Sequence, residues 1–220
     1  MTALLLDQYT IPYRPSLLVY DYERGFAKSV SRSGSIRYDH KYFKRYRDYE
    51  GSPLCDALNR CRVQLVQRFS RMPLDIGIGA GTFLKTFGAG YGYDVNPLGV
   101  AWLHAHGIWV DPYSSIPSCV DAVTMWDVIE HVANPYRLLD KIGGQWLFLS
   151  LPIFADLKDV ASSKHHKPGE HLWYFTSRGL RRFMDEAGFA LIEHNWMESE
   201  LGRDSIETYV FRRHIIRPHR

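Results

Sequence analysis

Three glycines alternate with other residues in the segment DIGIGAGTF, residues 75–83, which directly follows a short apolar run. Glycine lets a backbone turn sharply and approach a ligand closely, so a strand that ends in such a loop is typical of a nucleotide-like cofactor site. Asp75 adds a carboxylate two residues before the first glycine. The segment predicts a ligand-binding turn, and its structural alternative is a tight strand-to-helix turn without a ligand.

The spacing of these glycines argues against two common nucleotide sites. Gly77, Gly79 and Gly81 give GxGxG, and Thr82 stands where a dinucleotide fingerprint requires its third small residue. No lysine follows in a GK[ST] arrangement, which excludes a P-loop. The loop therefore favours neither a nicotinamide dinucleotide nor a nucleoside triphosphate.

A second carboxylate narrows the choice of ligand. Asp94 lies nineteen residues after Asp75, at the end of the next apolar run, where an acidic side chain can accept hydrogen bonds from ribose hydroxyls. The ligand then needs a ribose, a positively charged group near Asp75 and no pyrophosphate. S-adenosylmethionine has all three properties.

The string DVIEH, residues 127–131, follows a later apolar run and carries groups that could move a proton. His131 titrates in the range suited to a general base, and it follows a predicted strand, at the end where ligands of such sheets bind. Glu130 is the adjacent candidate for the same chemistry. The structural alternative is that Glu130 and His131 only cap and orient the following turn.

The loop KHHKPGEHLWYFT, residues 164–176, places three histidines and a glutamate close together. His165, His166, Glu170 and His171 could bind zinc, but their spacing matches no standard zinc site. We expect instead a flap over the active site, anchored by the aromatic residues 173–175, with His171 contacting the acceptor. We therefore predict no metal ligands.

Short apolar runs alternate with capped helical segments from residue 73 onward, which predicts an open, mostly parallel α/β sheet with helices on both faces. The expected strands are PLDIG, GYGYD, GIWVD, DAVTMWD, WLFLSLP, FALIEHNW and SIETYVFRR. Helices are expected after Asn96 with Pro97, after Asn134 with Pro135, and after Thr176. Ligands of such sheets bind beyond the carboxyl ends of the strands, where the glycine segment lies.

Residues 1–72 are predicted to form an N-terminal arm, irregular over 1–36 and helical later, that covers the active site of a domain spanning 73–220. Ser52 and Pro53 begin its clearest helix. Between Arg14 and Arg71 there are 13 Lys and Arg against 6 Asp and Glu, with many tyrosines interleaved. This composition fits either an anionic partner, including nucleic acid, or a solvated arm packed on the main domain.

The rest of the composition is typical of a cytoplasmic protein. The 220 residues hold no apolar run long enough to span a membrane, and the N-terminus lacks the basic flank of a signal peptide. The three cysteines are odd in number and form no CxxC pair, which indicates free thiols. The sequence leaves the oligomeric state open.

The ordered segments DIGIGAGTF, YGYDVNP, DAVTMWDVIEHV, LFLSLP and EHLWYFTSRGLRRFMDEAGF resemble class I S-adenosylmethionine-dependent methyltransferases over roughly residues 73–196. The branch they most resemble includes the ubiquinone-biosynthesis O-methyltransferases. The resemblance implies a Rossmann-like, doubly wound, seven-stranded sheet with a C-terminal antiparallel hairpin. It also implies the cofactor contacts of Asp75, Gly77, Ile78, Gly79, Gly81, Asp94, Val95, Asp111, Trp126 and Asp127.

By that resemblance the three glycines line the methionine part of the cofactor, and Asp75 contacts it indirectly. Asp94 holds the ribose, Val95 lies beside the adenine, and Asp111 meets the adenine amino group. Trp126 and Asp127 flank the cofactor. In the quinone branch a divalent metal has been associated with an acid-x-x-Glu-His string, a spacing that residues 127–131 retain.

The predicted reaction is methyl transfer to a small molecule that carries a hydroxyl, amine or carboxylate. MWDV stands where amino-methylating DNA enzymes have an Asn/Asp-Pro-Pro-aromatic string, and Cys119 precedes the strand after which cytosine-C5 enzymes place their nucleophile. RNA or a modified nucleic acid remains an alternative acceptor because of the basic arm. A non-catalytic S-adenosylmethionine-binding module is the second alternative.

Overall fold

The computed structural model describes residues 17–30, 44, 47–142 and 146–214. Within them, nine strands form one sheet in the order β1-β2-β7-β6-β5-β3-β4, and β9 pairs with both β6 and β8. The strands are β1 (Leu18–Asp21), β2 (Phe26–Ser29), β3 (Pro73–Ile76), β4 (Tyr91–Tyr93), β5 (Ala122–Trp126), β6 (Trp146–Phe154), β7 (Trp173–Thr176), β8 (Phe189–Asn195) and β9 (Ile206–Arg213). None of the helices in these ranges is long and apolar enough to cross a membrane.

The helices are α2 (Pro53–Gln67), α3 (Thr82–Phe87), α4 (Pro97–Ala105), α5 (Pro135–Lys141), α6 (Ser177–Glu186) and α7 (Met197–Glu200), with 3-10 turns η1 (Ile129–His131) and η2 (Leu157–Ser162). Side chains of Ser52, Asn96, Asn134 and Thr176 accept hydrogen bonds from backbone N–H groups in the first turn of α2, α4, α5 and α6. Each bond satisfies a donor that the helix itself leaves unpaired. The predicted helix starts are confirmed.

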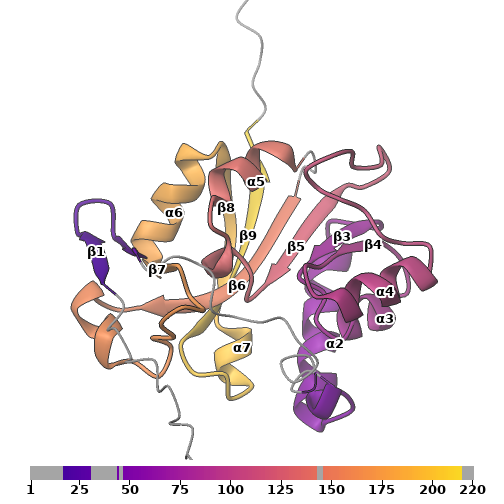
Figure 1. Cartoon of the computed structure of the whole chain (residues 1–220), viewed down its shortest axis with the longest axis horizontal. Coiled ribbons are helices and arrows are strands. Elements are labelled where there is room, and N and C mark those ends of the chain that lie inside the picture. The colour runs from indigo at the N-terminus through magenta and orange to yellow at the C-terminus, as the bar shows by residue number, and fades with distance from the viewer. Residues whose placement is uncertain (1–16, 31–43, 45–46, 143–145, 215–220) are drawn as a thin grey trace, which may run out of the picture.

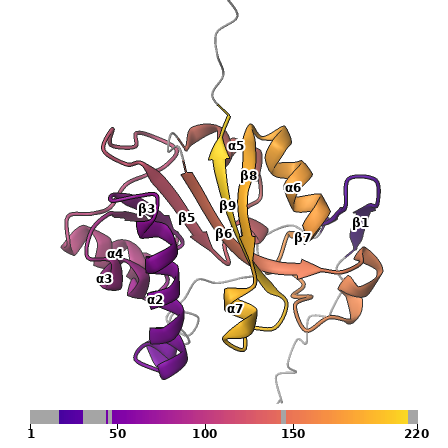
Figure 2. The ribbon, with the colours of Figure 1, turned by 180° about the vertical axis from the view of Figure 1, so that it is seen from behind.

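Two hydrophobic clusters fill the two faces of the sheet. One cluster contains side chains of α5 and α6 packed on the strands, and the other contains side chains of α2, α3 and α4. Figures 1 and 2 show these two groups of helices and, at the opposite end of the sheet from α2, α3 and α4, the β1–β2 hairpin. Strands β3, β4, β5 and β6 run parallel, and β8 and β9 form an antiparallel hairpin. The predicted α/β architecture with its C-terminal hairpin is confirmed.

The strand count differs from the seven expected, for three reasons. GIWVD forms only an isolated bridge between Trp109 and Gly92. The chain leaves the sheet there because the Asp111 carboxylate accepts a hydrogen bond from the Tyr113 N–H, and Pro112 has no N–H to extend the ladder. Residues 18–29, predicted to be irregular, form the β1–β2 hairpin, and the aromatic residues 173–175, predicted to anchor a flap, form β7 between β2 and β6.

The part of the arm that the structure describes is integrated into the core. Helix α2 contributes buried Val63, Leu65 and Val66 to the cluster beneath α3 and α4. Lys44 and residues 47–49 are helical, which agrees with the helical structure predicted for the later part of the arm, and residues 31–43 and 45–46 lie outside the described residues. The three cysteines are free thiols, as predicted.

The hairpin is fixed to α6 by a close backbone approach. A Cβ placed on Gly179 would lie 1.8 Å from the carbonyl oxygen of Gly25, and Thr176 Oγ1 donates a 2.9 Å hydrogen bond to the same oxygen. Such a contact tolerates no side chain at Gly179, because overpacking forces the backbones apart.

Gly179→Ala should therefore lower the free energy of unfolding by about 1–3 kcal/mol, although alanine is the better helix former. Chemical denaturation measures this change. Arg178→Ala, at the exposed neighbouring position of α6, is the control and should change stability by less than about 0.5 kcal/mol. Equal stability of Gly179→Ala and the natural protein would contradict the tight approach.

Candidate active site

A cavity of about 950 Å³ opens where β3, β4 and β5 end, and α2 and the loop after η2 supply its other walls. It collects most of the residues predicted from the sequence to form the site. Those lining it are Asp75, Gly77, Ile78, Gly79, Asp94, Val95, Trp126, Asp127, Glu130, His131 and His171. Gly81 and Asp111 do not line it.

The glycine loop has the backbone conformation that its sequence suggested. Gly77, Gly79 and Gly81 all have positive φ, at 79°, 55° and 75°. A Cβ on Gly77 would lie 2.4 Å from a methyl group of Val128, so a side chain there would collide with the loop after β5. Gly81 caps the N-terminus of α3 from beneath Trp102, which explains why it shapes the loop without facing the cavity. Gly77 and Gly81 each combine a positive φ with a close neighbouring side chain, and glycine is the residue that tolerates both conditions.

Asp94 is held in one orientation by two backbone donors. Its Oδ1 accepts a 2.7 Å hydrogen bond from the Asn96 N–H, and its Oδ2 accepts a 3.1 Å bond from the Gly79 N–H. Burial raises the pKa of this carboxyl group, while the backbone hydrogen bonds act in the opposite direction. Each oxygen retains a lone pair, so the group is pre-oriented to accept two further hydrogen bonds from a ligand.

Several buried polar atoms around the cavity have no hydrogen-bond partner among the described residues. They are Asn59 Oδ1, Asp75 Oδ2, Trp126 Nε1 and both carboxyl oxygens of Glu130. Buried polar groups in proteins are rarely left unsatisfied, so this set fits a polar ligand that would complete them. Asp75 is 1% exposed, Thr124 Oγ1 donates to its other oxygen at 2.6 Å, and burial raises its pKa to about 7.

The outer end of the cavity is aromatic and open. Tyr93 and Tyr113 meet edge to face with ring centroids 6.3 Å apart, and Val95 beside them is 57% exposed. These surfaces suit a flat heterocycle such as adenine. Asp111 does not line the cavity, and its carboxylate accepts a hydrogen bond from the Tyr113 N–H. Tyr113, which sequence reasoning missed, does line it.

At the inner end, Glu130, His131 and His171 come together. One oxygen or nitrogen of each lies within 4.8 Å of the others, and the two imidazole rings meet edge to face at 4.7 Å. Burial lowers the pKa of His131, and it lowers that of His171 to about 2, whereas burial raises the pKa of Glu130 well above its usual range. Burial therefore disfavours the charged form of all three side chains.

The cluster has two chemical uses. His131 Nδ1 lies 3.0 Å from the Glu170 carbonyl oxygen, which places the ring proton on Nδ1 and leaves Nε2 able to take a proton from an acceptor. Alternatively, two neutral imidazoles and one carboxylate form a donor set suited to a divalent transition-metal ion. Within the described part of the chain no other group of histidine, cysteine and acidic side chains has this compactness.

The other histidines of the 164–176 loop do not join the cluster. His165 Nε2 lies 2.8 Å from the Asp204 carbonyl oxygen, and the ring of His166 packs against Tyr174. Because His165 and His166 make these separate contacts, the histidines of the loop are not gathered into one zinc site. The loop is instead joined to η1, because the Leu172 N–H donates a 2.7 Å hydrogen bond to the Glu130 carbonyl.

Sequence reasoning missed a second wall of the cavity. Asn59 and Arg62 enter it from α2, and Arg203 enters it from the loop after α7. A weak signal existed for α2, since two polar residues one turn apart interrupt its buried side. Nothing local marks Arg203, because only the fold brings it to the end of β5.

The chain resembles known proteins in both sequence pattern and fold. A family model described as a methyltransferase domain matches residues 43–194. Among curated proteins no match was found.

Three solved structures illustrate the likeness of fold. A chain of the Haloferax volcanii complex between the Trm112 methyltransferase activator and a methyltransferase has a TM-score of 0.58 at 15% identity, over 82% of this chain and 100% of that one. Magnesium protoporphyrin IX methyltransferase from Synechocystis, with bound SAH, has a TM-score of 0.58 at 15% identity, over 80% of this chain and 96% of that one. A SAM-dependent methyltransferase from Archaeoglobus fulgidus has a TM-score of 0.55 at 17% identity, over 80% of this chain and 100% of that one.

Asp94→Asn should weaken binding of S-adenosylhomocysteine (SAH) by about 10- to 100-fold, because an amide cannot accept hydrogen bonds at both positions that the carboxylate offers. Isothermal titration calorimetry measures the affinity, and thermal unfolding of the free protein reports whether the fold is retained. Asp185→Asn, on the exposed surface of α6, is the control and should bind normally. Unchanged SAH affinity in Asp94→Asn would exclude the ribose role.

Proposed function

Since the chain belongs to the methyltransferase family whose model it matches, with S-adenosylmethionine as its cofactor, we propose that it is a small-molecule methyltransferase. The proposed acceptor carries a hydroxyl, amine or carboxylate. One observation carries the proposal. A single cavity contains both the glycine loop and the cluster of Glu130, His131 and His171. The donor site and a candidate acceptor site are therefore adjacent.

When bound, S-adenosylmethionine supplies a methyl group activated by its sulfonium. The chain's own residues then have to align the acceptor and exclude water, since proximity provides most of the acceleration in such displacements. We assign donor binding to the loop of residues 77–81, to Asp75, and to Asp94 for the ribose hydroxyls. Trp126 and Val95 would border the sulfonium end and the adenine respectively.

For a hydroxyl acceptor we assign the general base to His131. Its Nδ1 is engaged by the Glu170 carbonyl, so Nε2 is the free basic atom, and its lowered pKa keeps the ring neutral at physiological pH. Glu130 Oε1 lies 3.8 Å from that nitrogen and the His171 ring packs against His131, so both would orient the acceptor. The Asp127, Glu130 and His131 spacing supports a hydroxyl acceptor of the kind methylated by the resembling quinone branch.

The dimensions of the cavity favour a small acceptor over a nucleic acid. Its volume lies at the upper end of the range for ligand pockets, which leaves room for the donor and one compact molecule. Its lining includes only three cations among the described residues, Arg62, Lys167 and Arg203, which is fewer than the roughly 6–10 phosphate contacts of a nucleic-acid site would need. The free thiols support a cytoplasmic location.

His131→Ala should slow transfer to a hydroxyl acceptor by about 10²–10⁴-fold while SAH affinity stays within about twofold. Because the pKa of His131 is lowered, the natural enzyme should be independent of pH from about 7 to 8 and lose activity only as pH falls below 6.5. Initial rates with labelled donor measure both effects.

His214→Ala, at an exposed position near α6, is the matched control and should leave the rate unchanged. A normal rate in His131→Ala would exclude the base role. Loss of activity on chelation, with recovery on adding a divalent cation, would assign the cluster to metal binding.

Methyl transfer should be seen with a pool of small molecules and should depend weakly on salt. A nucleic-acid acceptor making 6–10 phosphate contacts would instead lose about 10³–10⁵ in affinity between 50 and 200 mM salt. Labelled-donor assays with small-molecule and RNA pools, with and without ribonuclease, separate the two. Donor binding without transfer to any pool would favour the non-catalytic module.

A further inference from the structure

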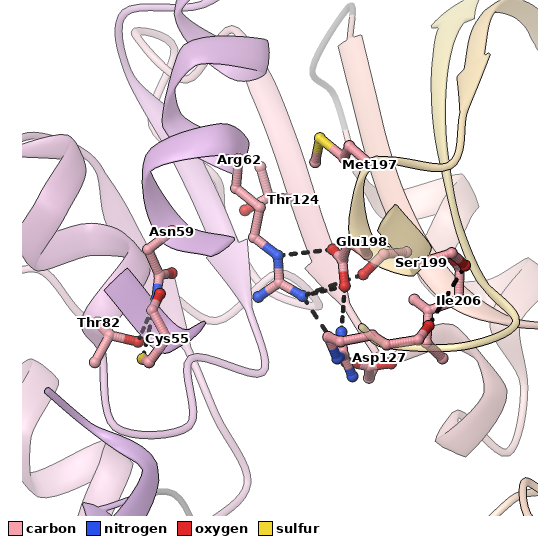
Figure 3. A network of polar contacts seen from close by, with 12 residues as sticks. Cys55, Asn59, Arg62, Thr82, Thr124, Asp127, Met197, Glu198, Ser199 and Ile206 are labelled. Carbon is pink, nitrogen blue, oxygen red and sulfur yellow. Dashed lines mark hydrogen bonds and ion pairs between the residues drawn. The ribbon is translucent and has the colours of Figure 1, made fainter. Parts of the chain in front are cut away.

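Two guanidinium groups converge on one carboxylate at the cavity wall. Arg203 Nη2 lies 2.7 Å from Asp127 Oδ2, and Arg62 Nη2 lies 3.9 Å from the same oxygen. Figure 3 shows Arg62 reaching from α2 toward the segment that carries Glu198, with Asp127 beneath them. Arg62, Asp127 and Arg203 all line the cavity. They come from α2, from the end of β5 and from the loop after α7, respectively.

Glu198 holds the two arginines in place. It is fully buried and accepts hydrogen bonds from Arg62 Nε at 2.8 Å and Arg62 Nη2 at 2.9 Å, as well as from Arg203 Nη1. Arg62 also packs over the ring of Trp126, 4.7 Å from its centroid. One buried glutamate cannot neutralise two cations, so a positive charge is left facing the cavity, where Asp127 meets it.

Asp127 occupies that position in an unfavourable backbone conformation. Its φ of 56° is left-handed, which is uncommon for a residue other than glycine. Its N–H donates to the Ser150 carbonyl at 2.8 Å, which fixes the chain there, and its side chain is 31% exposed to the cavity. Strained residues of this kind are concentrated at ligand sites.

The donor proposed above carries a carboxylate as well as an ammonium group at its amino-acid end. We propose that Arg62 and Arg203 form the subsite for that carboxylate, and that the Asp127 carboxylate occupies the subsite when no donor is bound. The inference rests on the proposed function, because it needs a donor at the glycine loop.

The surrounding groups support this placement. Arg62 is close enough to Asp75 for its positive charge to lower the pKa of that carboxyl group, so the arginines flank the methionine end of the loop. Asp75, with one unpartnered oxygen, is the group suited to the ammonium. Lys167, the remaining cation of the cavity wall, acts on Glu130 and His171, at the acceptor end.

Two ligands that differ only in the carboxylate test the subsite. SAH has it, and S-adenosyl-3-thiopropylamine lacks it but keeps the amine and the adenosine. Calorimetry on the natural protein should show SAH binding about 10- to 100-fold more tightly, as expected for charge-assisted hydrogen bonds. Equal affinity of the two ligands would overturn the proposal and leave the donor site intact, whereas binding of neither would overturn the proposed function as well.

Arg203→Gln should reduce the preference for SAH to within about threefold without changing the affinity for S-adenosyl-3-thiopropylamine. Glu198 keeps Arg62 as its partner in this variant, so the fold should persist, and thermal unfolding checks this. Arg203→Lys should restore part of the preference. Arg68→Gln, which removes an exposed arginine paired with Glu193, is the matched control and should retain all of it. Equal weakening of both ligands by Arg203→Gln would overturn the carboxylate role.

Asp127→Asn tests the competition between the chain's own carboxylate and that of the donor. Removing the resident negative charge should tighten SAH binding by about 3- to 10-fold and leave S-adenosyl-3-thiopropylamine unchanged. Weaker SAH binding in Asp127→Asn would show that Asp127 itself contacts the donor, and it would overturn the idea that this carboxylate occupies the subsite in the donor's absence.

Discussion

The burial of carboxyl groups at the ends of parallel strands dominates the chemistry of this protein. Asp75 lies near the carboxyl end of β3, Asp94 directly follows β4, and Glu130 lies in η1 after β5. Burial is the largest influence raising the pKa of each. Removing these groups from water is unfavourable unless a ligand or the backbone satisfies them. Only Asp94 is satisfied by two backbone donors, so the other two make the cavity a strong site for polar or cationic ligands.

The second organising feature is the ion cluster that joins distant parts of the chain. Glu198 ties Arg62 of α2 to Arg203, and Arg203 in turn meets Asp127 at the end of β5. Breaking a buried pair of this kind leaves an uncompensated charge, so the cluster fixes the N-terminal helix and the β8–β9 connection against the glycine loop. Three separate segments of the chain are therefore held together at this wall of the cavity.

Features encoded locally were predictable from the sequence, and those that depend on tertiary contacts were not. The caps at Ser52, Asn96 and Asn134, the glycine loop and the carboxylate of Asp94 follow from short patterns, because each acts within a few residues of itself. The run WYF, residues 173–175, was assigned to a flap because its strand is stabilised by pairing with β2 and β6, which lie far from it in the sequence. The proximity of Arg62 and Arg203 could not be predicted, since they lie 141 positions apart in the sequence.

The β1–β2 hairpin has a consequence for how this protein can diversify. The Ser29 N–H donates to the Leu172 carbonyl, and the Leu172 N–H donates to Glu130, so the hairpin braces the segment that presents His171. None of these bonds involves the glycine loop or Asp94. If Glu130, His131 and His171 hold the acceptor, as proposed above, changes in this hairpin would act on the acceptor end of the cavity and would make no direct contact with Asp94 or the glycine loop.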